Sequence, residues 1–277
     1  MAIEPTPRPA DDADRAQPSA GGRSTPEPQD GSGAATSGMG RPQQEPTDST
    51  RLRLYQLVSP ALPVGAFSYS EGLEVLVQSG QLGAAAAVQA WLEAELLRGA
   101  LRLEAAALPS LMALLGAWQE QSERGDPEAV QTRARLLDRD GWLLAQREAG
   151  ALRAQQRQMG GSLLRLLADL GWPLHEPIQL AWPAAFAWAG HALAVPHEAL
   201  VEAYLYGWVA NQLSAAVRLV PLGPTEAQRL QLRLAPTIAA QAAALASTDP
   251  ERLWNGGVGA GLAQLGHSGL YSRLFRS

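Results

Sequence analysis

Apolar residues recur at helical spacing along almost the whole chain from Arg51 onward. No run alternates apolar and polar residues cleanly enough to predict a β-strand. The clearest pattern follows Pro196, where two adjacent apolar rows repeat every four residues. A polar row of Asn211, Ser214 and Arg218 lies elsewhere on the same helix. So broad an apolar stripe predicts a central helix that several others cover, and we expect an all-α fold, a single bundle of roughly eight to ten helices.

Proline and glycine mark where the other helices should begin and end. Asp126, Pro127 and Glu128 together favour a helix start, since they offer a cap, a first-turn proline and an early acid. The helices expected in order are 51–58, 70–79, 84–117 with a bend at Gly99, 127–158, 162–170 after Gly160-Gly161, one buried helix between Glu176 and Glu198, 197–220, and 224–246 with a kink at Pro236. The stretch 60–65 can only be a loop, because two prolines and a glycine interrupt it.

The two ends of the chain differ in composition from its middle. Residues 1–50 hold eight of the 20 prolines, eight acidic residues and four arginines, and they cannot bury enough apolar surface to offset their chain entropy. Six glycines between residues 256 and 269 are typical of a flexible linker. We therefore expect a disordered Pro-rich acidic extension over 1–50, one all-α domain over 51–255, and a flexible C-terminal tail over 256–277.

Composition excludes several classes of function. All 22 positively charged residues are arginine, so a phosphate-binding loop with its lysine and a lysine Schiff base are excluded. The absence of cysteine excludes disulfides and thiolate chemistry and fits a reducing cytoplasm. After residue 50 the net charge is only −1 (18 Arg against 19 acidic residues), which gives no reason to expect nucleic acid. We expect a cytoplasmic protein without a membrane segment, since prolines interrupt the uncharged stretch 177–197.

Motifs for metal binding or catalysis are missing. The four histidines do not form His-Glu-x-x-His, and no glutamate lies three residues before any of them. We therefore predict no metal, cofactor or catalytic residue. Two glutamate pairs, Glu71/Glu74 and Glu198/Glu202, have spacings that put both carboxylates on one helical face. A helical enzyme that uses such a pair as acid and base is an alternative, although these spacings are common on ordinary helices.

Two segments look costly for a purely structural role. The segment 59–74 packs two prolines, Phe67 and Tyr69 into a stiff loop, which is either a recognition surface or a cover for the core with Phe67 buried. The last seven residues combine three large apolar side chains with two arginines, residue types that dominate interface energetics. This tail is either a peptide that orders when a partner binds or a segment docked on its own domain.

These segments carry a family resemblance. Leu-Val-Ser-Pro-Ala-Leu-Pro-Val-Gly-Ala-Phe-Ser-Tyr-Ser-Glu-Gly-Leu-Glu (57–74) and Tyr-Ser-Arg-Leu-Phe-Arg-Ser (271–277) resemble the two signatures of the urease accessory protein F (UreF) family. Gln158-Met159-Gly160 with the Leu-Leu that follows, and Tyr206-Gly207-Trp208 leading to Ser-Ala-Ala-Val-Arg-Leu-Val-Pro-Leu-Gly (214–223), resemble further family motifs in the expected order. The resemblance spans about 52–277.

The resemblance implies an all-α assembly chaperone of urease maturation that is not an enzyme and has no nucleotide site. Such a protein binds the D/H-type accessory protein, with the F subunits forming a homodimer. The complex recruits the nickel-carrying GTPase G, whose activity F helps regulate, and docks on apo-urease so that nickel is inserted. A generic helical scaffold for some other complex is the remaining alternative.

By the same resemblance, the tail contacts the D/H partner and the loop shapes the neighbouring surface. The partner-binding residues expected are Tyr271, Ser272, Arg273, Leu274, Phe275, Arg276, Ser277, His267, Gly65, Phe67, Ser68, Tyr69, Glu71 and Gly72. The chain departs from the family at three positions. Pro224 stands where the family commonly has Gln, and Gly266 and Ser268 flank His267 where the family has Arg and Glu.

Overall fold

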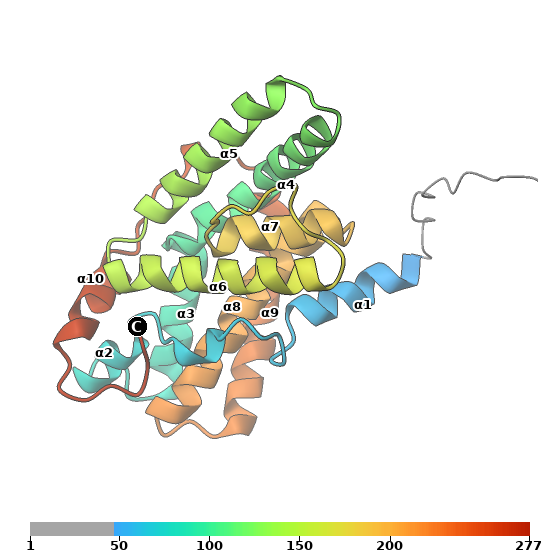
Figure 1. Cartoon of the computed structure of the whole chain (residues 1–277). Helices are drawn as coiled ribbons and strands as arrows, with labels where there is room; N and C mark the ends of the chain where they lie inside the picture. The colour runs from blue at the N-terminus through green and yellow to red at the C-terminus, as the bar shows by residue number, and fades with distance from the viewer. Residues whose placement is uncertain (1–46) are drawn as a thin grey trace, which may run out of the picture. The chain divides into compact units, whose positions relative to one another are not determined.

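The computed structural model describes residues 47–277 and confirms the all-α fold in that range, with no β-strand there (Figure 1). The α-helices are α1 (Thr47–Leu57), α2 (Leu73–Gln78), α3 (Ala85–Arg98), α4 (Leu101–Glu123), α5 (Glu128–Ala145), α6 (Gly150–Asp169), α7 (Trp182–Ala192), α8 (His197–Leu219), α9 (Pro224–Leu245) and α10 (Val258–Gly266). Three short 3₁₀ turns cover Ala66–Ser68, Pro250–Arg252 and His267–Gly269. The disorder predicted for residues 1–50 falls mostly outside the described residues, and 47–50 form the first turn of α1.

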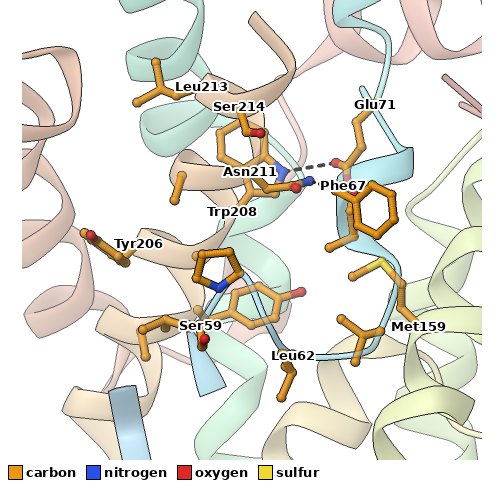
Figure 2. A pocket seen from close by; sticks show the side chains of 18 of the residues that line it. Ser59, Leu62, Phe67, Glu71, Met159, Tyr206, Trp208, Asn211, Leu213 and Ser214 are labelled. Atoms are coloured by element: carbon orange, nitrogen blue, oxygen red, sulfur yellow. Dashed lines mark hydrogen bonds between the residues drawn. The ribbon is translucent and has the colours of Figure 1, made fainter. Parts of the chain in front are cut away.

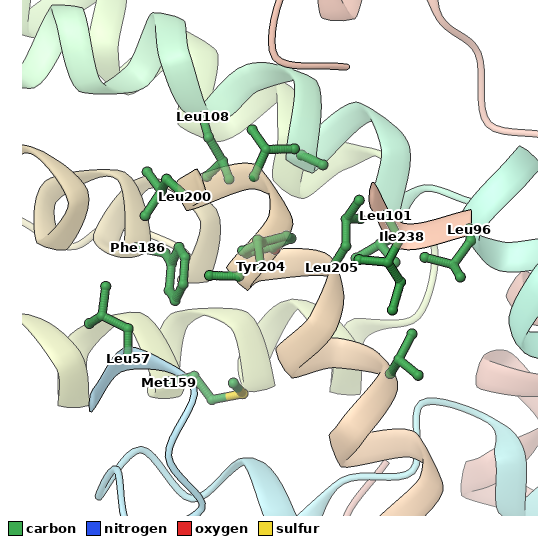
Figure 3. Packing of buried hydrophobic residues seen from close by; sticks show 14 of the residues in the cluster. Leu57, Leu96, Leu101, Leu108, Met159, Phe186, Leu200, Tyr204, Leu205 and Ile238 are labelled. Atoms are coloured by element: carbon green, nitrogen blue, oxygen red, sulfur yellow. The ribbon is translucent and has the colours of Figure 1, made fainter. Parts of the chain in front are cut away.

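Helices α4 and α8 lie at the centre of the bundle. Helix α4 packs on α3, α5, α7, α8 and α9, and α8 packs on α1, α2, α3, α7 and α9 as well. Figure 3 shows Leu108 of α4, Phe186 of α7 and Tyr204 of α8 meeting in the core. The rings of Phe186 and Tyr204 lie edge to face, with centroids 5.3 Å apart. The central helix predicted after Pro196 is thus confirmed as α8.

A buried polar group sits inside this apolar core. The Arg147 Nε donates to one oxygen of the Glu104 carboxylate at 2.7 Å, and the Tyr204 hydroxyl donates to the other at 2.8 Å. Burial, and after it the charge of Glu104, raises the pKa of Tyr204 well above its usual value, so the phenol remains a donor. Burial opposes the charge on Arg147, but the carboxylates of Glu104 and Glu71 outweigh it and raise the pKa of that guanidinium. Arg147 therefore stays charged, and Tyr204 stays a neutral hydrogen-bond donor to Glu104.

Two predicted helix boundaries are wrong, and packing explains both. The helix predicted from Pro127 does start at Glu128, whose N–H donates to the Asp126 carboxylate at 2.9 Å, but it ends at Ala145 instead of reaching residue 158. The chain breaks at 146–149 because Arg147 turns inward to meet Glu104. The Gly160-Gly161 pair lies inside α6 and does not end a helix.

Gly160 serves close packing. A Cβ at this position would stand 2.3 Å from the carbonyl oxygen of Leu180, so only glycine lets α6 approach the backbone before α7. The bend predicted at Gly99 is a full break between α3 and α4, where Gly99 is extended. The helix expected from residue 70 begins at Leu73, after the 3₁₀ turn at Ala66–Ser68.

The remaining helix predictions are confirmed in outline. The buried helix expected between residues 176 and 198 is α7, whose residues 183–190 are all buried. Helix α9 starts at Pro224, where a missing N–H costs nothing, and continues past Pro236. Within the described residues, only α4 is long and apolar enough to cross a bilayer, and 67% of its most apolar stretch is buried inside the bundle.

Candidate functional site

The two segments singled out by the sequence lie against each other. The backbone oxygen of Ser277 accepts hydrogen bonds from the N–H groups of Ser70 and Glu71, at 2.8 and 3.1 Å, and from the Ser70 hydroxyl at 2.8 Å. The N–H of Arg276 donates to the carbonyl of Ser68 at 2.9 Å. In Figure 1 the end of the chain lies near α2 and α6. Of the two alternatives for the tail, the structure shows the segment docked on its own domain. The glycine-containing stretch that was predicted to be a flexible linker contains helix α10.

A buried carboxylate of α2 holds the tail backbone. One oxygen of Glu74 accepts from the N–H of Leu274 at 2.6 Å, and the other accepts from the N–H of Phe275 at 3.1 Å. His267 Nε2 lies 3.2 Å from the second oxygen, and both side chains are buried. Glu74 therefore gives both backbone donors an acceptor, and without it the buried Phe275 N–H would lack a partner.

Helix α8 binds both segments through its polar row. The Arg218 guanidinium donates to the carbonyl of Phe67 at 2.7 Å and lies over the ring of Phe275, 4.3 Å from its centroid. The Asn211 amide donates to the carbonyl of Ala66 at 3.0 Å. The row of Asn211, Ser214 and Arg218 that the sequence placed off the apolar stripe thus faces the loop.

Gly72 allows α10 to pack on α2. Its φ of +92° is in the left-handed region, and a Cβ there would stand 3.0 Å from the backbone nitrogen of Gln264. Next to it, the Glu71 carboxylate accepts from Gln155 at 2.8 Å and from the Trp208 indole at 3.0 Å. The Tyr69 hydroxyl donates to Gln158 at 2.9 Å, which ties the loop to α6.

Twelve of the fourteen predicted partner-binding residues fall into two groups. Six are buried against the chain's own domain: His267, Phe275, Ser277, Tyr69, Glu71 and Gly72. Six are exposed: Tyr271, Ser272, Arg273, Leu274, Arg276 and Phe67. Gly65 and Ser68 are partly exposed, and the departing positions Gly266 and Ser268 are exposed as well. The buried group anchors the tail and loop, and the exposed group faces outward.

An apolar row on α10 is exposed as well, and the sequence reasoning missed it. Val258, Leu262 and Leu265 recur at i, i+4 and i+7, and their exposed fractions are 68%, 63% and 47%. Trp254, just before the helix, is 83% exposed. The spacing was a readable signal, but the glycines of the segment favoured a linker. We call these four residues, together with Tyr271, Ser272, Arg273, Leu274 and Arg276, the tail surface.

A pocket of about 600 Å³ opens beside the loop. Figure 2 shows Phe67 and Glu71 on one side and Trp208, Asn211 and Ser214 of α8 near them. Most of the remaining lining is apolar, from the loop, α6, α8 and the start of α9. Phe67 is 64% exposed, so the alternative in which it is a buried core residue is wrong.

The glutamate pairs do not form an acid–base site in this pocket. Glu198 and Glu202 are exposed and do not line it. Glu71 lines it, but both of its oxygens already accept hydrogen bonds, while Glu74 points to the tail. Among residues 47–277, no three His, Cys, Asp or Glu side chains are close enough together to hold a metal ion.

Comparison with known proteins agrees with these motifs. A UreF family model matches residues 82–235. The chain is 41% identical over 230 residues to the urease accessory protein UreF of Alkalilimnicola ehrlichii, covering 81% of this chain and 95% of that protein. It is 40% identical over 238 residues to the urease accessory protein UreF of Synechocystis sp., covering 83% and 98%. With that of Thermosynechococcus vestitus the identity is 38% over 237 residues, covering 83% and 99%. The chain therefore belongs to the UreF family.

Proposed function

We propose that this chain is a urease accessory protein, an assembly chaperone required for nickel insertion into apo-urease, and not an enzyme. Relatives named urease accessory protein UreF match this chain over nearly their whole length. It works in the cytoplasm, as a homodimer within a complex with the D/H-type accessory protein. This complex recruits the nickel-carrying GTPase G, regulates its activity, and docks on apo-urease.

The observation that carries this proposal is the tail surface. It comprises exposed aromatic, aliphatic and arginine side chains, and Glu74 and Ser70 hold the backbone of its last residues in place. Exposed apolar patches rimmed by polar residues are typical of protein–protein contacts, and aromatic and arginine anchors contribute most of their energy. The tail surface is therefore the proposed site for the D/H partner.

The outer face of the loop is the proposed neighbouring contact within the same complex. Phe67 projects at the rim of the pocket, and Arg218 and Asn211 fix the carbonyls of Phe67 and Ala66. The same Arg218 contacts Phe275, so loop and tail share one support. This arrangement supports a continuous binding region made of both segments.

Co-purification with the D/H partner tests the proposal. We compare the full chain, a chain ending at Leu270, and a Tyr271→Ala/Leu274→Ser variant that keeps the backbone anchors. Only the full chain should capture the partner, while circular dichroism shows the same helix content in all three. Capture by both altered chains would contradict the role of the last seven residues and leave the α10 row or Phe67 as the contact.

Urease activation in cells separates the proposal from a generic scaffold. In a host that carries urease and its other accessory proteins but lacks this one, the chain should restore urease activity. The tail variant should restore much less. If the chain captures a partner but urease activity does not depend on it, it is a scaffold for another complex.

A further inference from the structure

A buried carboxylate lies where the tail leaves the helical body. Glu95, in the last turn of α3, is 7% exposed. The C-terminal segment crosses over it, and the Gly256 N–H donates to the carbonyl of Arg98 at 2.8 Å. A Cβ on Gly99 would stand 2.3 Å from one Glu95 oxygen, and a Cβ on Gly257 would stand 3.3 Å from the other. The carboxyl thus lies between the backbones of the two glycines.

This carboxyl differs from the other buried glutamates of the region. Glu71, Glu74 and Glu104 each accept at least two hydrogen bonds. In the part of the chain that the structure describes, no group donates a hydrogen bond to Glu95. It lines a cavity of about 10 Å³, the volume of roughly one water. An ionised carboxylate without a donor is costly to bury.

The charges around Glu95 do not compensate for this burial. Arg147 lines the same cavity, but Glu104 already binds it. The negative charge of Glu71, on the loop, disfavours ionised Glu95, whereas the positive charge of Arg98, on α3 itself, favours it. Glu148 lines the cavity with a second carboxylate. The crossing segment 254–261 carries no charged residue, and the carbonyl end of α3 disfavours an anion. Burial is the largest cause, and it raises the pKa of Glu95 from 4.5 to about 7.

We infer that Glu95 is a proton-dependent latch for the tail: protonated Glu95 lets segment 255–261 close over it, and ionised Glu95 favours an open segment in which the carboxylate is fully hydrated. Glu95 keeps its proton in the closed form up to about pH 7, whereas a solvated glutamate loses it near 4.5. Opening of the tail therefore becomes about tenfold more favourable for each pH unit between these values and levels off above pH 7. The latch itself is inferred independently of the proposed function. Only its control of partner capture rests on that function.

Hydrogen exchange of the full chain alone, at pH 5, 6, 7 and 8, tests the latch. After correction for intrinsic rates, amide protection over residues 256–270 should fall about tenfold per unit from pH 5 to 7 and then stay level. In Glu95→Gln, which mimics the protonated side chain, protection should stay high and independent of pH. Glu148→Gln removes the exposed carboxylate of the same cavity and should behave like the parent.

Each outcome decides the inference. Amide protection that does not change with pH in the parent chain overturns it. This result needs no variant, so the test remains decisive even if Glu95→Gln folds poorly. An unchanged pH dependence in Glu95→Gln also overturns it, and loss of the dependence in Glu148→Gln assigns the titration to the other carboxylate. No partner is present, so failure here is distinct from failure of the proposed function.

Discussion

Glu74 and Phe275, 201 residues apart in the sequence, are joined by a hydrogen bond of 3.1 Å from the Phe275 N–H to the Glu74 carboxylate. The same carboxylate accepts from Leu274, so it fixes the direction of the tail backbone. Phe275 then points inward beneath Arg218, while Leu274 stays 59% exposed. One buried side chain therefore decides which tail residues anchor and which face outward.

Replacing Glu74 should release the tail and spare the bundle. Glu74→Ala leaves two backbone donors and His267 without their acceptor, at a cost of about 1–3 kcal/mol. We expect rapid proteolysis after Arg273 and Arg276 with little loss of helix signal. Glu202→Ala, on the exposed face of α8, should be cleaved no faster than the parent. Equal resistance in Glu74→Ala would contradict this role.

Gly72→Ala should weaken the contact between α2 and α10. The alanine Cβ would meet the backbone of Gln264 at 3.0 Å and would also strain a φ of +92°. The matched control is Gly80→Ala, at a φ of +77° with no atom within 4 Å of the added Cβ. Backbone strain alone costs about 1–2 kcal/mol, so urea unfolding should show a clearly larger loss for Gly72→Ala. Equal losses would mean that the close approach is unimportant.

The buried ion pair should matter more than any exposed one. Arg147→Leu leaves the Glu104 carboxylate buried without its cation, and we expect the free energy of unfolding to fall by about 3–5 kcal/mol. Tyr204→Phe removes one hydrogen bond and should cost about 1–3 kcal/mol. Arg124→Ala breaks a 3.9 Å surface pair with Glu120 and should cost at most about 0.5 kcal/mol. Denaturant unfolding should rank the three losses in free energy of unfolding in this order. A different order would contradict the larger role of the buried ion pair.

Polar substitutions on α10 should affect binding without affecting the fold. Leu262→Ser/Leu265→Ser changes two exposed side chains, so the thermal midpoint should move by only a few degrees while capture of the proposed D/H partner falls at least tenfold. Leu232→Ser, at a 74% exposed position of α9, is the control and should leave capture intact. Full capture by the double variant would place the contact elsewhere on the tail surface or on the loop.

Much of the candidate site was readable from the sequence as two separate segments. The crowded prolines and aromatics of 59–74 and the aromatic and arginine residues of 271–277 marked both segments as unusual for a purely structural role, and they left a recognition surface and a structural role as alternatives. Their contact with each other was not readable. It depends on Glu74 and Arg218, which look like ordinary polar positions on helices until the fold brings the tail to them. The α10 row was missed because glycine has low helix propensity, which favoured a linker.

The sequence by itself determined the elements whose causes are local. Helical periodicity and proline at first-turn positions are properties of neighbouring residues, so the all-α class, the central helix α8 and the starts of α5 and α9 followed from them. Only the tertiary structure decided the break at Arg147, the continuous helix through Gly160 and the docked tail. Each of these depends on a partner distant in sequence: Glu104, the carbonyl of Leu180, and the Glu74 carboxylate. Local patterns carry no information about such partners, because burial and close approach arise only when the helices pack.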